Sequence, residues 1–181
     1  MKRHPRNVEF RLISELLKNS HRSDRELAKV LRVSQPTVSR IIKKLEEEGY
    51  IREYTIIPSF SKLGFHLLGL TFIKIHKELD AEEIEKVREA TRERLAMSHF
   101  GIVMLERGIG LKYDGVIMCF YRNYSEFTEH HAEISKYPFV EVSELAGFLI
   151  NLDDPIRYRP LTLSILSDYL TRTFDESKDQ P

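Results

Sequence analysis

Small polar and cationic side chains gather at the start of the segment SQPTVSRIIKKLEEEG, which runs from Ser34 to Gly49. Groups of this kind bind nucleic acids, because Gln pairs with adenine, Arg pairs with guanine and Lys mostly contacts phosphate. The same segment carries an apolar stripe at the spacing of a helix, formed by Val38, Ile41, Ile42 and Leu45. The spacing predicts a helix with one buried face and one face that can enter the major groove of double-stranded DNA.

The side chains expected to contact DNA are Ser34, Gln35, Pro36, Thr37, Ser39, Arg40 and Lys43, together with Arg52 shortly after the helix. The alternative is that the polar face is only solvated, since helix-turn-helix folds also serve as protein-interaction modules. The basic charge of this part of the chain favours DNA. Residues 1–66 hold 14 Lys and Arg against 8 Asp and Glu, whereas the remaining residues hold 14 against 20.

Local signals predict two more helices ahead of this segment, over residues 7–19 and 24–31. Ser23 followed by Glu26 has the spacing of a capping box, and Ser34 with Pro36 in the first turn marks the next helix start. Gly49 ends that helix because glycine tolerates a left-handed backbone. The last two helices are separated by a turn of about three residues, as in a helix-turn-helix. The β-branched and aromatic run over residues 50–60 predicts a strand and a wing-like turn after it.

The second half of the chain alternates strands and helices. Strands are expected over residues 66–76, 98–108, 113–123 and 139–152, and helices over residues 80–96 and 124–137. The order β-α-β-β-α-β is typical of a ferredoxin-like fold. We therefore predict an α+β protein with a winged helix-turn-helix domain at residues 1–64, a ferredoxin-like domain at residues 65–152 and a C-terminal helical extension at residues 153–181.

Residues 11–64 resemble the DNA-binding half of the Lrp/AsnC, or leucine-responsive, transcription regulators. The resemblance rests on Leu45, Glu46, Glu47, Gly49 and Ile51 and on the link Lys62, Leu63 and Gly64; the second half is similar in its order of elements. The turn position that the family usually fills with glycine is Arg32 here, so the turn must form without glycine.

The resemblance implies sequence-specific DNA binding, pairing of the second domains into a homodimer or higher homo-oligomer, and control by a small-molecule effector. The family's effector-side loop corresponds to RGIGLKYDG at residues 107–115, so Gly108, Gly110, Tyr113 and Asp114 are the expected effector-binding residues.

No other chemistry is indicated. The sequence has no metal-ligand spacing, phosphate loop or catalytic triad, so we expect no catalytic residue, metal or cofactor. His130 and His131 are expected to lie at the surface. An enzyme of the siroheme decarboxylase type, which shares the family's architecture, is the alternative. Its Arg-Arg-Ile-Gly element is replaced here by IREYTIIP. One cysteine, Cys119, and the lack of an apolar run of about 20 residues favour a cytoplasmic protein without a membrane span.

Overall fold

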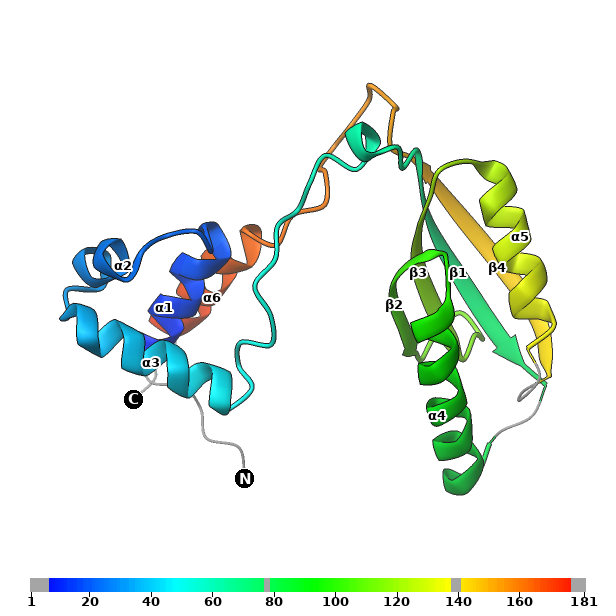
Figure 1. Cartoon of the computed structure of the whole chain (residues 1–181), viewed down its shortest axis with the longest axis horizontal. Coiled ribbons are helices and arrows are strands. Elements are labelled where there is room, and N and C mark those ends of the chain that lie inside the picture. Colours follow the sequence, from blue (N-terminus) through cyan, green and yellow to red (C-terminus); the bar gives the residue numbers. More distant parts are fainter. Residues whose placement is uncertain (1–6, 77–78, 138–140, 177–181) are drawn as a thin grey trace. The chain divides into compact units, whose positions relative to one another are not determined.

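The chain forms two compact units in a computed structural model that describes residues 7–76, 79–137 and 141–176. One unit contains residues 1–57 and 158–181, and the other contains residues 58–157 (Figure 1). The chain therefore passes between the units twice. The sequence predicted domain boundaries after residue 64 and after residue 152. The main difference in the structure is that the C-terminal segment from residue 158 belongs to the first unit.

The first unit contains the three expected helices, α1 (Asn7–Lys18), α2 (Asp24–Leu31) and α3 (Gln35–Glu47). Ser23 and Glu26 form the reciprocal capping box at the start of α2. The turn after α2 is made at Arg32, whose backbone is left-handed with φ 58° and ψ 45°. The expectation that this turn forms without glycine is confirmed, at the energetic cost that a Cβ brings to this backbone region. Gly49, with φ 74°, follows α3 in the expected left-handed conformation.

The core of the first unit is built from the apolar stripes of its three helices. Leu12 of α1, Leu27 of α2 and Val38 and Leu45 of α3 have no exposed surface. Ile42, the fourth member of the α3 stripe, packs at the edge of this core. The predicted buried face of α3 is thus confirmed, and its polar face is left outside.

A fourth helix, α6 (Ile165–Glu176), lies along α1 (Figure 1). Small side chains meet where the two helices approach: the Ser14 hydroxyl donates to the Ser167 carbonyl oxygen at 3.2 Å and lies 3.3 Å from the Thr171 hydroxyl. Ser14 and Ser167 are both buried. The C-terminal extension is therefore part of the first unit's packing.

The strand expected within residues 50–60 does not form, and residues 51–59 have no regular secondary structure. A strand needs a neighbour to satisfy its backbone groups, and the described part of the first unit contains no strand. The segment is held instead by side chains, since the Tyr54 hydroxyl donates to Glu46 Oε1 of α3 at 3.0 Å. The β-branched composition alone was a misleading signal here.

The second unit has the expected β-α-β-β-α-β order. Its elements are β1 (Leu67–Ile75), α4 (Ala81–Met97), β2 (Gly101–Arg107), β3 (Gly115–Tyr121), α5 (Tyr124–Ser135) and β4 (Val142–Asn151). The four strands form one antiparallel sheet in the order β2-β3-β1-β4. A short 3-10 helix, Ser61–Leu63, precedes β1. The ferredoxin-like prediction is confirmed.

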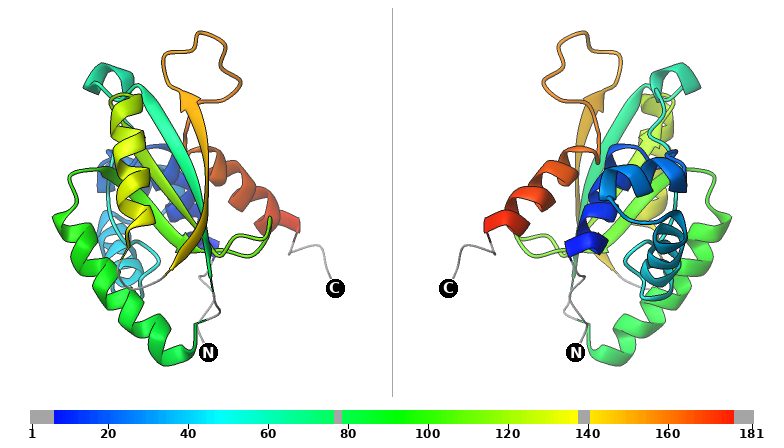
Figure 2. Two further views of the ribbon diagram at one scale, coloured as in Figure 1. Left: turned by 90° about the vertical axis from the view of Figure 1, so that its right-hand side faces the viewer. Right: turned by 90° about the vertical axis from the view of Figure 1, so that its left-hand side faces the viewer.

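The two faces of this sheet differ. Helices α4 and α5 lie on one side (Figure 2), where Cys119, Tyr121 and Phe127 are buried between sheet and helix. Close packing there depends on Gly147, because a Cβ at this position would lie 2.6 Å from the Phe127 ring. The alternate residues of the strands point to the opposite face. No described α-helix covers this face, but one end of it is covered by Phe60, whose ring stacks on Phe120 of β3 with ring centres 4.0 Å apart.

Candidate nucleic-acid interface

The start of α3 is organised by its N-cap. Ser34 has an extended backbone, and its hydroxyl accepts a hydrogen bond from the Thr37 N–H at 3.3 Å. The Ser34 and Thr37 hydroxyls also lie 2.8 Å apart. Pro36 occupies the first turn, where no intrahelical N–H is needed. Ser34 and Thr37 are therefore partly engaged in capping, and the helix start leaves backbone N–H groups at a site suited to phosphate.

Four of the expected DNA-contacting residues form one exposed surface on α3: Gln35, Pro36, Arg40 and Lys43. Arg40 has no hydrogen bond or ion pair among the described residues. Lys43 has only a loose ion pair with Glu47, at 3.8 Å between largely exposed side chains, which contributes little to stability. Both cations are available to an incoming anion.

Ser39 and Arg52 have other surroundings. The Ser39 hydroxyl donates to the Asp24 carboxylate of α2 and approaches the Gln35 carbonyl oxygen at 3.3 Å. Ser39 therefore links the two helices of the helix-turn-helix. Arg52 is exposed in the segment that follows α3.

Two acidic residues of α1 hold neighbouring parts of the first unit, and the sequence pattern did not reveal their roles. Glu9 is buried and accepts a hydrogen bond from Lys44 Nζ of α3 at 3.2 Å. Glu15 pairs with Lys18 at 2.8 Å and with Arg22. Burial would raise the pKa of Glu15, but these two cations outweigh it and hold that pKa below its ordinary value. Of these ion pairs, only Glu15–Lys18 could have been predicted from the sequence, because the two residues are three apart on one helix.

The four expected effector-side residues all belong to the loop between β2 and β3. Gly108 and Gly110 are exposed, and nothing lies within 4 Å of a Cβ built on either. Leu111 and Lys112 have left-handed backbones with φ 51° and 65°, which is unfavourable for residues with a side chain.

Tyr113 and Asp114 anchor this loop to the sheet. The Tyr113 hydroxyl donates to Glu144 at 2.6 Å. Asp114 accepts from Lys74 Nζ at 3.1 Å and from the Ile75 N–H at 2.9 Å, and these hydrogen bonds lower the pKa of Asp114, the backbone one contributing most. The loop is thus a strained, exposed tip held on a fixed base.

The expectation of surface histidines on α5 is wrong for His130. His130 is only 4% exposed, and its Nδ1 lies 2.7 Å from the hydroxyl of buried Tyr121. Burial lowers the pKa of His130 to about 4. His131 is half-buried, with Nε2 2.8 Å from the buried Thr71 hydroxyl. These two imidazoles lie on the face of α5 that packs against the sheet, together with its apolar residues. The spacing of residues within the helix did not show that the histidines are on this face.

Comparison with known proteins agrees with the architecture. Residues 6–52 match the family model described as winged helix-turn-helix DNA-binding. Solved structures of the same two-part fold cover nearly the whole chain: LrpC of B. subtilis has a TM-score of 0.66 and 20% identity, covering 87% of this chain and 100% of that one. AsnC of E. coli has a TM-score of 0.64 and 18% identity, covering 88% and 99%. The chain is therefore a helix-turn-helix protein with a ferredoxin-like second domain.

Its relatives define the family more closely. An HTH-type transcriptional regulator of Pyrococcus furiosus is 33% identical over 107 residues, which is 59% of this chain and 66% of the relative. LrpA of Pyrococcus horikoshii is 36% identical over 80 residues, 44% of this chain and 57% of LrpA. The chain thus spans roughly half to two thirds of these relatives. It belongs to the Lrp/AsnC family of HTH-type transcriptional regulators.

The relatives are named as transcriptional regulators, which supports the expected regulator over a decarboxylase-type enzyme. In the described ranges, no helix has both the length and the apolar character needed to cross a bilayer.

Proposed function

We propose that this protein is a sequence-specific, DNA-binding transcription regulator that acts in the cytoplasm. The observation that carries the proposal is the exposed start of α3, where Gln35 and Arg40 stand beside a capped helix N-terminus. In this proposal α3 enters the major groove, with Gln35 and Arg40 at base edges and Lys43 at phosphate. Ser34, Pro36 and Thr37 lie at the adjoining backbone, Arg52 contacts a flanking phosphate, and Ser39 approaches DNA while holding α3 to α2.

DNA binding of this kind calls for symmetry, because one recognition helix makes only a short contact. Two copies would place their α3 helices on half-sites about 34–36 Å apart, or a multiple of that spacing. We propose that the open face of the second unit's sheet forms the homodimer contact. Most of its strand positions are apolar, and the exposed apolar residues there include Phe148 and Ile150. An open apolar face of this kind marks an interaction surface.

The first test is a titration of the protein into labelled fragments of its own upstream region at two salt concentrations. We expect saturable binding that weakens by about 0.9 log units per log unit of salt for each phosphate contact. Arg40→Ala should lose on the order of 1–3 kcal/mol on the specific site and little on random DNA. Arg88→Ala, which removes an exposed arginine of α4, is the matched control. No binding at low salt, on that fragment or on pooled genomic DNA, would favour a protein-interaction module.

A small-molecule effector at the second unit is the second part of the proposal. A transcriptional regulator of Neisseria meningitidis, with a TM-score of 0.69 and 15% identity over 89% of this chain and 96% of that one, has a structure in complex with L-Met. In this chain the strained tip around Gly108 and Gly110 is the proposed contact, with Tyr113 and Asp114 holding it in place. An effector that prefers one of two conformations would shift DNA binding through that difference in affinity.

Thermal unfolding in the presence of single amino acids and related metabolites tests the effector. A bound ligand raises the melting temperature in proportion to the logarithm of its excess over Kd. The shift should disappear in Gly110→Val, since a side chain is strained at φ 131°, and should persist in His76→Ala on the same unit. A flat response across the panel would remove the effector from the proposal.

A further inference from the structure

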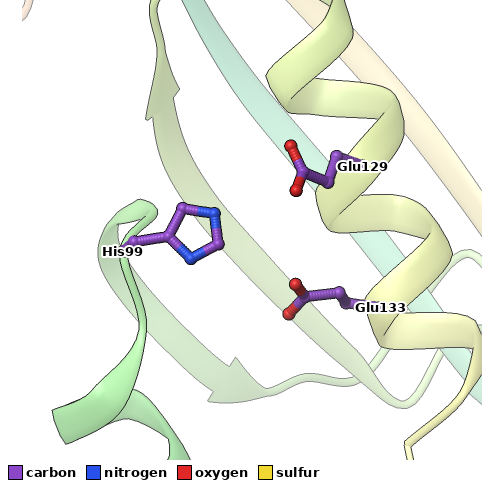
Figure 3. A group of neighbouring side chains, drawn as sticks. All are labelled: His99, Glu129 and Glu133. Atoms are coloured by element: carbon purple, nitrogen blue, oxygen red, sulfur yellow. The ribbon is translucent and has the colours of Figure 1, made fainter.

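Two glutamates and a histidine converge on the helix-covered side of the second unit (Figure 3). Glu129 and Glu133 lie one turn apart on α5, and His99 lies between the end of α4 and the start of β2. One ligand atom from each of the three residues lies within 4.8 Å of the other two. The three residues share no short sequence motif, because His99 is separated from the glutamates by two strands.

The donor set determines which ion fits. An imidazole nitrogen with two carboxylates suits divalent ions of the series from Mn²⁺ to Zn²⁺, whereas Mg²⁺ and Ca²⁺ favour oxygen ligands only. Ligand distances of about 2.0–2.2 Å around Zn²⁺ place ligand atoms about 3–3.5 Å from one another. The three ligand atoms, which lie within 4.8 Å of one another, would have to move closer through side-chain rotations when an ion binds. We propose that His99, Glu129 and Glu133 bind one divalent transition-metal ion, with water in the remaining coordination positions.

The backbone positions of the ligands are fixed by packing. Phe127, His130 and Ile134 are buried on the inner face of α5, which leaves Glu129 and Glu133 on its outer side. His99 is held between Ser98, whose N–H ends α4 by donating to the Leu95 carbonyl oxygen at 3.2 Å, and Phe100. The Phe100 ring stacks on His130 with ring centres 4.4 Å apart. An ion would therefore join two elements that are already set in place.

Two of the three ligand residues are free for coordination, and the third has one weak partner. Among the described residues, neither His99 nor Glu129 has a hydrogen bond or an ion pair. Glu133 has one competitor, Arg94 of α4, whose Nη2 lies 3.6 Å from its carboxylate, with both side chains nearly half exposed. Exposed pairs of this kind are weak, so a metal ion can displace the arginine.

Binding should stabilise the second unit. Helix α4 has no buried residue. Its contacts with the neighbouring α5 region include the Thr91–Tyr137 hydroxyl pair at 2.5 Å, the Arg94–Glu133 ion pair and the Arg94 guanidinium 5.6 Å from the centre of the Tyr137 ring. An ion held by His99 and α5 would link the end of α4 to α5. The stabilisation would follow from preferential binding to the folded state.

The test is a titration of the full chain with Zn²⁺ by calorimetry, repeated with Co²⁺, whose visible absorption reports coordination. We expect one equivalent per chain and a rise in melting temperature over the metal-free protein in EDTA. His99→Ala and Glu129→Gln should weaken binding by about 10-fold or more, since even outer-shell changes cost 10–100-fold. His76→Ala, an exposed histidine on the same unit, is the matched control.

Arg94→Gln gives the opposite sign, because it removes the competitor: binding should tighten by up to about 5-fold, the upper worth of an exposed ion pair. Equal melting temperatures of the wild type and the ligand variants in EDTA would show that folding is intact. Zn²⁺ affinity that is the same in His99→Ala as in His76→Ala, or no saturable binding at about millimolar Zn²⁺, a weak-binding limit, would overturn the proposal.

Discussion

Two residues, Arg32 and His130, are in unfavourable conformational or electrostatic environments that the surrounding structure explains. Arg32 takes a backbone conformation that usually needs glycine, because the turn between α2 and α3 requires it. Burial against Tyr121 and Phe100 lowers the pKa of His130 to about 4, so His130 stays uncharged in mild acid, where an exposed histidine is protonated. Arg32 therefore costs the folded state free energy through backbone strain, and His130 does so as the pH falls; each can be tested by substitution.

Arg32→Gly should stabilise the first unit by about 0.5–1 kcal/mol. Relief of the left-handed strain, worth about 1–2 kcal/mol, outweighs the extra chain entropy that glycine brings to the unfolded state. Urea unfolding followed by circular dichroism measures the difference. Lys29→Gly, inside α2, should cost about 1 kcal/mol as a control. Destabilisation of the same size in both variants would contradict a strained turn.

His130 should make the second unit less stable as the pH falls. Its folded pKa of about 4 lies below the ordinary 6.5 of the unfolded chain, so the unfolded state binds the proton first. Stability is therefore lost progressively from about pH 6.5 towards about pH 4. Denaturant unfolding at about pH 7 and about pH 5, above most carboxylate titration, should show a smaller loss for His130→Gln than for the wild type. His76→Gln should behave as the wild type; equal losses in all three would mean that His130 is protonated in the folded state.

At the scale of elements, helices built from local signals are joined by contacts that are distant in sequence. Helix α3 is held to α1 by Lys44 and Glu9 and to α2 by Ser39 and Asp24. Helix α6 reaches α1 from the far end of the chain. The position of the candidate DNA-binding surface thus depends on a helix more than 100 residues away in sequence.

Ser167→Leu should destabilise the first unit by about 1–3 kcal/mol, since a large side chain in a close helix contact forces the backbone or its neighbours to move. Ser167 has 1% of its surface exposed. Arg172→Leu, at an exposed position within α6, should stay within about 0.5 kcal/mol. Thermal unfolding compares the two variants. A neutral Ser167→Leu would mean that α6 is not packed on α1 in solution.

At the scale of the molecule, the two units have opposite charge balances and different surfaces. The basic unit presents the polar start of α3, and the acidic unit has an open apolar sheet face. Two chain crossings connect the units. In the proposed mechanism the second unit supplies symmetry and ligand response, and the first supplies DNA contacts.

Phe148→Glu should convert the proposed oligomer into a monomer of 21.3 kDa, because a charge buried in an apolar interface is left without a partner. Light scattering at micromolar protein concentration measures the mass. Tyr124→Glu is matched in exposure, with 63% against 61% for Phe148, and lies on α5 instead of the sheet. It should keep the mass of the wild type. A wild-type mass of one chain would remove the symmetric mechanism.

Local signals in the sequence were enough to predict the helices, the order of strands and the polar face of α3. Capping residues such as Ser23 and Ser34 and the apolar stripe through Val38 act within one or two turns, so the sequence shows their effect without the fold. The turn at Arg32 was predicted in the same way.

The tertiary structure alone decided the features that depend on distant neighbours. The segment after α3 has strand-forming residues but no strand beside it, so it stays irregular. His130 is buried only because the sheet covers that side of α5, and α6 packs on α1 although nothing near it in sequence indicates this. Strand pairing, burial of polar groups and ligand clusters such as His99 with Glu129 and Glu133 are set by contacts across the chain, whereas periodicity and capping report only on neighbours within a helix or strand.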